Sequence, residues 1–118
     1  MINEEAKEII ENNPVAFATI DHDGHPNVIA VAYVKVADDK NIIITDNYMQ
    51  TTKDNILRSP NVCLAVWDKE WKGYKIKGVA SYYTEGKWFD FIKSLPENKD
   101  CPAKGAILIE VSEIIELQ

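Results

Sequence analysis

The chain has few cysteines, no excess of positive charge and no long hydrophobic run, and each shortage excludes a class of protein. Its 118 residues include two cysteines, too few for the disulfide framework of a small secreted domain. No apolar stretch approaches the ~20 residues of a membrane-spanning helix. The sequence also lacks GxGxxG, Walker and GxSxG motifs, so dinucleotide, P-loop and serine-hydrolase sites of the common kinds are not indicated.

The charge balance argues against a nucleic-acid partner. There are 13 basic and 19 acidic residues, a net charge of −6, and no basic stripe that could follow a phosphate backbone. The N-terminal segment MINEEAKEII is too acidic for a secretory signal. Together with the low cysteine count, this predicts a protein of the reducing cytoplasm, without a membrane partner.

What is present is the composition of one folded domain. Hydrophobic residues make up 46% of the chain and charged residues 27%, as in globular rather than disordered proteins. The length suits a single core, and we find no internal repeat or linker, so residues 1–118 are predicted to form one domain.

Hydrophobic periodicity predicts six strands and three short helices. Asp23-Gly24 marks a tight hairpin turn, and Gly78 inside a strand indicates a bulge or a close backbone approach. The helices are expected over 3–13, from Thr51 onward and over 86–95. The strands are expected over 15–21, 27–37, 41–45, 61–67, 74–84 and 106–117.

This order of elements indicates a mainly β fold. The first three strands should form an antiparallel meander, and six strands with short helices suggest a closed or partly closed barrel. A barrel this small is filled by its own side chains, so a ligand would lie outside it or between subunits. The nearly unbroken apolar run from Val28 to Val34 favours a partner subunit on the second face; alternatively, the helices cover that face.

The most informative segment is 41–62, in which a β-branched strand leads into a helix. The helix opens with Thr51, Thr52 and Lys53, which offer hydroxyls, one positive charge and unpaired backbone N–H groups. These are the groups that hold a phosphate at a helix start. Alternatively, one of the two threonines simply caps the helix.

Three other features of the sequence bear on its chemistry. His22 and His25 flank Asp23, but such a turn splays them and no third ligand is evident, so no metal site is predicted. Ala30 and Ala32 are small enough to let a planar ring approach, or to fit a crowded barrel interior. Trp71 lies in a predicted loop and is a candidate to pack against the edge of such a ring.

Two segments carry a resemblance to a known family. They are DHDGHPNVIAV at 21–31 and ITDNYMQTTKDNILRSPNVCLAV at 44–66. Their order and spacing resemble those of the FMN-binding split-barrel family, which contains pyridoxamine 5′-phosphate oxidase and smaller flavoproteins. The resemblance implies a six-stranded antiparallel split barrel, Greek-key-like in its connections, that forms a homodimer and binds FMN between its subunits.

The resemblance also implies which residues hold the cofactor. The phosphate would be held by Gln50, Thr51, Thr52 and Lys53, with Asn55 close behind. The flavin ring would pack on Val28, Ile29, Ala30 and Val31 and meet Thr45, Asp46 and Asn47. Where many relatives carry two cations, this chain has Lys53 alone, unless Arg58 reaches the phosphate.

The expected function is therefore that of an FMN flavoprotein, an oxidoreductase or electron-transfer protein. The C-terminal VSEIIELQ lacks the substrate-binding arginine and histidine of true pyridoxamine 5′-phosphate oxidases, so that reaction is not expected. The alternatives are a split barrel that binds F420 or haem, and a cofactor-free binding or structural domain.

Overall fold

The computed structural model describes residues 1–32 and 34–117. Its helices are α1 (Glu4–Asn12), α2 (Thr51–Arg58) and α3 (Lys87–Ser94), with a short 3-10 helix η1 (Pro96–Asn98). Its strands are β1 (Val15–Ile20), β2 (Pro26–Val31), β3 (Lys35–Val36), β4 (Asn41–Asp46), β5 (Asn61–Trp67), β6 (Gly73–Tyr83) and β7 (Gly105–Glu116).

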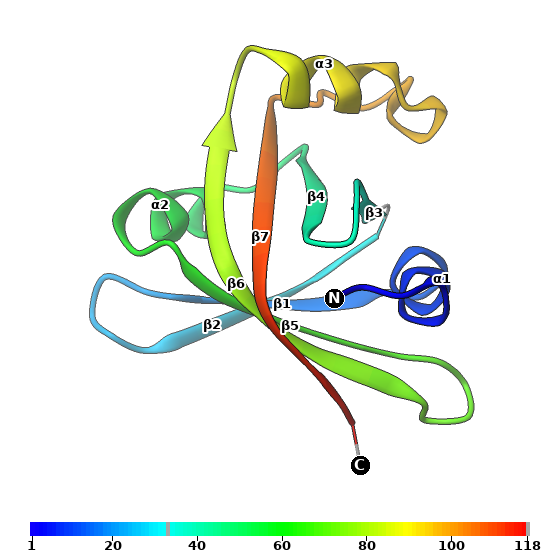
Figure 1. Ribbon diagram of the computed structural model, residues 1–118. Coiled ribbons are helices and arrows are strands. Elements are labelled where there is room, and N and C mark those ends of the chain that lie inside the picture. The colour runs from blue at the N-terminus through cyan, green and yellow to red at the C-terminus, as the bar shows by residue number, and fades with distance from the viewer. Residues whose placement is uncertain (33, 118) are drawn as a thin grey trace.

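These strands form one antiparallel sheet in the order β2-β1-β5-β6-β7-β4-β3. The long strands β6 and β7 curve through the middle of the molecule, with β4 beside one end of them and β5, β1 and β2 crossing at the other (Figure 1). The curled sheet fits the expected split barrel. α3 and η1 lie beyond the ends of β6 and β7, and α2 lies beside β6.

The number of strands and the meander differ from the expectation. The predicted strand over 27–37 is two strands: Val31 at the end of β2 pairs with Val15, whereas Lys35 at the start of β3 pairs with Ile43. The described chain therefore has seven strands rather than six. β2 and β3 occupy opposite ends of the sheet order, so β2 and β4 do not pair and the meander is wrong. A continuous apolar run cannot reveal where its pairing partner changes.

Local signals in the sequence correctly located several elements. The Asn3 side chain caps α1 by accepting a hydrogen bond from the Ala6 N–H at 2.8 Å. Gly24 adopts φ 85° in the β1–β2 turn, where a left-handed backbone favours glycine. The register of β6 against β7 shifts between Lys77 and Gly78, which confirms the predicted bulge.

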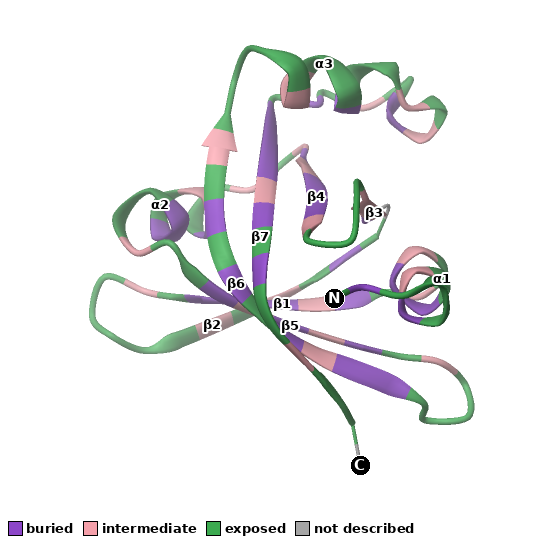
Figure 2. Cartoon of the chain, viewed as in Figure 1, coloured by how far each residue is buried: buried purple, intermediate pink, exposed green. Residues whose placement is uncertain are grey.

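The main core lies inside the curl of the sheet. Phe17, Ile42, Ile44 and Leu64 are among its fully buried side chains. Ile43 points the opposite way, into a smaller cluster with Ile92, Ala103 and Ala106 under α3. β4 is thus buried on both faces (Figure 2), as its uninterrupted isoleucine run suggests.

The sheet also has a face of small side chains that no other described element covers completely. Cross-strand pairing aligns Ala16 with Ala30 and Ala65, and Ala18 with Val28 and Cys63. Directly paired residues share a face, and these six are exposed or half-buried. We call Ala16, Ala18, Val28, Ala30, Cys63 and Ala65 the outer alanine face.

Candidate functional site

A groove of about 380 Å³ lies between the end of β2 and the turn that follows β4. It is lined by Ile29, Ala30, Val31, Ala32, Thr45, Asn47, Tyr48 and Met49. Five of these residues belong to the predicted ring site, and Ala32 is the second of the two small residues expected to let a ring approach, whereas Tyr48 and Met49 were not predicted. The groove joins apolar side chains of β2 to polar groups of the β4 turn, a composition suited to a partly polar ring.

Asp46 anchors that turn from beneath instead of lining the groove. Its carboxylate is fully buried and accepts hydrogen bonds from the Tyr82 hydroxyl at 2.6 Å and from the Met49 N–H at 2.8 Å. Lys104 reinforces the turn, because its Nζ lies 2.6 Å from the Met49 carbonyl oxygen and 3.9 Å from the Asp46 carboxylate. A buried carboxylate with these partners fixes the conformation of the groove wall.

Gly105 allows Tyr82 to reach Asp46. A Cβ at this position would overlap the hydroxyl and ring of Tyr82, so a side chain there would push the ring away. Burial raises the pKa of the Tyr82 phenol above its usual value, and the hydrogen bond to the Asp46 carboxylate raises it further. The phenol is therefore held in its neutral, hydrogen-donating form.

This arrangement predicts a loss of stability at alkaline pH. Above pH ~10 the unfolded chain ionises this tyrosine while the folded protein does not, so the free energy of unfolding falls as the pH rises further. We expect urea unfolding between pH 9 and 11 to show a steeper decline for the wild type than for Tyr82→Phe, by up to about 1 kcal/mol per pH unit. Parallel declines would mean that Tyr82 ionises normally.

The start of α2 has no side-chain cap. Its N-cap residue is Gln50, which makes no capping hydrogen bond, so the alternative that Thr51 or Thr52 caps the helix is wrong. Thr51 is exposed and Thr52 is buried. Lys53 is half-buried, with Nζ 5.1 Å from the centre of the Tyr82 ring. The first turn of α2 thus combines N–H groups that lack a side-chain acceptor with a positive charge.

Asn55 and Arg58 serve to attach α2 to β1. The Asn55 amide is buried and donates to Thr19 Oγ1 at 3.0 Å and to Asp21 Oδ1 at 2.8 Å. Arg58 donates to the Asn55 side-chain oxygen at 2.9 Å and to the Ile20 carbonyl at 3.1 Å. The second positive charge at the β4–α2 turn comes instead from Lys104, 55 residues from Met49. No local signal in the sequence indicated this lysine.

Besides Asp46, two residues predicted to lie beside the ring, Val28 and Trp71, are outside the groove. Val28 is 65% exposed on β2. Trp71, 76% exposed in the β5–β6 turn, stacks on Trp67 with ring centres 6.2 Å apart and planes at 10°. Trp67 borders Ala30 in a separate hollow of about 240 Å³, so Trp71 is linked to the groove only indirectly.

The histidine turn and the helices offer no further site. Asp23 Oδ2 lies 3.1 Å from His25 Nδ1 on the exposed hairpin. Across residues 1–32 and 34–117, no three His, Cys, Asp or Glu side chains gather where they could share a metal ion. None of the helices within those ranges has the length and apolar character needed to cross a bilayer.

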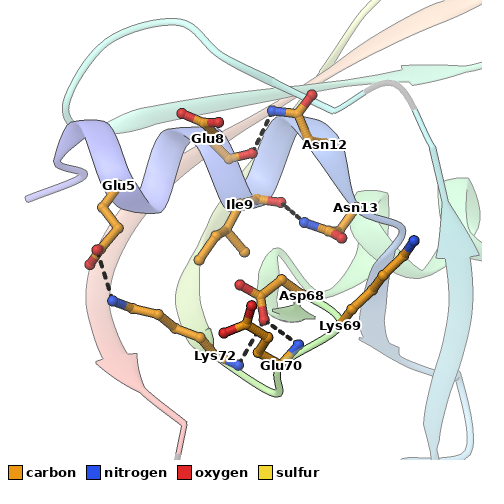
Figure 3. A pocket seen from close by; sticks show the side chains of 9 residues that line it. All are labelled: Glu5, Glu8, Ile9, Asn12, Asn13, Asp68, Lys69, Glu70 and Lys72. Atoms are coloured by element: carbon orange, nitrogen blue, oxygen red, sulfur yellow. Dashed lines mark hydrogen bonds and ion pairs between the residues drawn. The ribbon is translucent and has the colours of Figure 1, made fainter.

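A larger hollow, of about 450 Å³, lies between α1 and the β5–β6 turn (Figure 3). Two of its four acidic side chains, Glu5 and Asp68, have partners within the protein. Glu5 of α1 meets Lys72 at 2.8 Å, and Asp68 accepts hydrogen bonds from the backbone N–H groups of Glu70 and Lys72. These contacts brace α1 against the turn, so we take the smaller groove as the candidate functional site.

Comparisons with known proteins agree with this fold. The chain is 36% identical over 121 residues to protein MJ0282 of Methanocaldococcus jannaschii, which covers 99% of this chain and 81% of that protein. The crystal structure of HupZ from Group A Streptococcus superposes with a TM-score of 0.93 at 31% identity, covering 100% of this chain and 95% of the other.

More distant structures share the fold alone. An FMN-binding protein from Syntrophomonas wolfei has a TM-score of 0.83 at 20% identity, covering 98% of this chain and 85% of the other. An F420 reductase has a TM-score of 0.74 at 19% identity, covering 97% and 98%. The family model for pyridoxamine 5′-phosphate oxidase matches residues 2–118. Since that match spans nearly the whole chain, the protein belongs to the pyridoxamine 5′-phosphate oxidase family.

Proposed function

We propose that this protein is a homodimeric FMN-binding flavoprotein with a role in oxidation–reduction or electron transfer. The observation that carries the proposal is the continuity between the groove and the uncapped start of α2. Met49 lines the groove and directly precedes Gln50, the N-cap of α2. A ligand with a planar ring at one end and a phosphate at the other matches this arrangement.

The residues present fit the chemical groups of FMN. Ile29, Ala30 and Val31 offer apolar surface to the ring, while Thr45 and Asn47 offer polar groups at its edge. The phosphate would meet the first-turn N–H groups of α2 together with Thr51 and Lys53, and Lys104 adds positive charge at the preceding turn. When bound, the flavin supplies the electron-accepting and electron-donating chemistry, and the protein supplies orientation and electrostatics.

The outer alanine face supports the homodimer. Its small apolar side chains would allow two sheets to approach closely, and a symmetric pair of such faces is self-complementary. Ala30 belongs both to this face and to the groove. A second copy on the outer alanine face would therefore lie next to the proposed ring site, in agreement with a cofactor bound between subunits.

The direct test is an absorbance spectrum of freshly purified protein, followed by titration of the apoprotein with FMN. We expect a flavin spectrum, or binding at micromolar FMN followed by fluorescence quenching. A colourless protein that binds no FMN at these concentrations would refute the proposal. A thermal melt provides a second measurement, because a ligand that binds the folded state raises the melting temperature, whereas a cofactor-free domain would show no shift.

The fold shared with an F420 reductase makes F420 the second candidate. F420 also carries a planar ring, on a longer anionic tail, so the groove alone does not separate the two. A competition titration separates them. If FMN is the cofactor, we expect it to displace F420 at comparable concentrations. Displacement of bound FMN by a much lower concentration of F420 would instead favour the deazaflavin.

Lys53 should contribute directly to phosphate affinity. We expect Lys53→Ala to weaken FMN binding by about 1–3 kcal/mol, because a charge-assisted contact to the phosphate is lost. Isothermal titration with FMN and with riboflavin measures this, since riboflavin lacks the phosphate and its affinity should change little. Lys99→Ala, at an exposed turn position, is the control. Equal losses of affinity for FMN and for riboflavin would mean that Lys53 acts through the fold and not through contact with the phosphate.

A further inference from the structure

Asn98 of η1 contacts the groove from behind. Its side chain is 96% buried, and Nδ2 donates to Thr45 Oγ1 at 2.9 Å and to the Ile92 carbonyl oxygen at 2.9 Å. Thr45 is one of the residues that line the groove. A residue 53 positions away in the sequence therefore controls one of the polar groups offered to a ligand.

The Ile92 carbonyl fixes the orientation of the Asn98 amide. A backbone carbonyl can only accept hydrogen bonds, so the amide atom facing it must be the NH₂ group. A flipped amide would place its oxygen against the Ile92 carbonyl oxygen, and the two oxygens would repel each other. In the unflipped orientation Asn98 Oδ1 is buried without a hydrogen-bond partner among the described residues. A buried acceptor without a partner is unfavourable, and an apolar side chain at this position would avoid that cost.

This orientation determines what Thr45 can do. A threonine hydroxyl has one proton to donate and two lone pairs, and Asn98 occupies a lone pair of Thr45 Oγ1. The described residues offer this hydroxyl no other hydrogen bond, so its proton is free to point into the groove. We infer that the Thr45 hydroxyl donates a hydrogen bond to the ring of the ligand. Asn98 is the positioning residue, because its own hydrogen bond to Thr45 Oγ1 keeps the hydroxyl oriented as a donor.

The inference deepens the proposed function and rests on it. It adds a requirement on the ligand: the edge of its ring must present an acceptor, such as a ring nitrogen or a carbonyl oxygen, to Thr45. A ring with only C–H groups at that edge would leave the donor unpaired and would bind more weakly. Asn98 thus enforces specificity without touching the ligand.

A double-mutant cycle on FMN affinity tests this arrangement. Thr45→Val, which keeps the shape and removes the hydroxyl, should weaken FMN binding about five- to tenfold, and Thr45→Ser should stay within about twofold of the wild type. Asn98→Ala should weaken binding about three- to fivefold in the wild-type background. In the Thr45→Val background it should have almost no further effect, because the hydroxyl that it positions is gone.

Glu97→Ala is the matched control. It removes the 2.9 Å ion pair with Lys35 from the same short helix and should leave FMN affinity unchanged. The visible absorption bands of bound FMN should shift in Thr45→Val and in Asn98→Ala but not in Glu97→Ala, since a hydrogen bond to the ring alters its electronic transitions.

The outcomes separate the two ideas. Equal effects of Asn98→Ala in both backgrounds, or wild-type affinity in Thr45→Val, would overturn the inference and leave the FMN proposal intact. A wild-type protein that binds no FMN would overturn both. Circular dichroism of each variant establishes that the comparison is made between folded proteins.

Discussion

Asp46→Ala is expected to cost about 3–5 kcal/mol of the free energy of unfolding. The substitution leaves the Tyr82 hydroxyl and the Met49 N–H without their acceptor, and it leaves Lys104 without the nearby carboxylate. Hydrogen bonds to a charged group contribute about 1.5–3 kcal/mol each, and an orphaned buried donor adds its desolvation penalty. Urea unfolding at neutral pH, monitored by tryptophan fluorescence, measures the change.

The same variant should also lose FMN affinity, because Met49 and Asn47 of the anchored turn line the groove. Asp100→Ala is the control, since Asp100 is exposed and the substitution should change stability by less than about 0.5 kcal/mol. Stability in Asp46→Ala close to that of this control would contradict the role of Asp46 as the buried anchor. Normal stability with reduced affinity would instead place the carboxylate in contact with the ligand.

Ala65→Arg is expected to convert the proposed dimer into a folded monomer. Ala65 lies on β5 at the border of the outer alanine face, paired with Ala16 of that face on one side and with Lys75 of β6 on the other. In a symmetric dimer the substitution introduces two long cationic side chains into an apolar contact. Burying unpaired like charges costs several kcal/mol, so the dissociation constant should rise at least about 100-fold. Sedimentation velocity over a range of concentrations reports it.

Ala37→Arg is the matched control, because the same change is made at an exposed position after β3, away from the outer alanine face. It should leave the oligomeric state unchanged. If Ala65→Arg sediments as this control does, the dimer uses another surface; a monomeric wild type would exclude the homodimer itself. If the cofactor lies between subunits, FMN affinity should fall in Ala65→Arg together with dimerisation and remain normal in Ala37→Arg.

The elements that sequence reasoning located correctly are those with local causes. Asn3 caps α1 through an N–H three residues away, and the Asp23-Gly24 turn needs only its own backbone geometry. The bulge in β6 lies at Gly78 itself, the residue that marked it in the sequence. The start of α2 at Thr51 follows from its pattern and from the polar turn before it. Each of these signals lies within a few residues of the structure that it specifies.

The break in the expected strand over 27–37 has no such local cause. Val31 lies before the break and Val34 and Val36 follow it, and these β-branched residues favour an extended chain on both sides. Whether Val31 and Lys35 pair with the same neighbour depends on where the curled sheet brings β1 and β4. The pairing partners are set when the sheet closes around its core, and the order of apolar residues along the chain does not predict this closure.

The sequence by itself determined a small mainly β domain and singled out the segment 41–62 as the proposed place for a phosphate. The tertiary structure decided which side chains surround that segment. Tyr82 reaches Asp46 across 36 residues and Asn98 reaches Thr45 across 53, while Lys104 folds back onto the Met49 carbonyl. These contacts depend on the pairing of β7 with β4 and β6. Propensity acts between neighbours in the chain, whereas such hydrogen bonds form only once distant strands are already aligned.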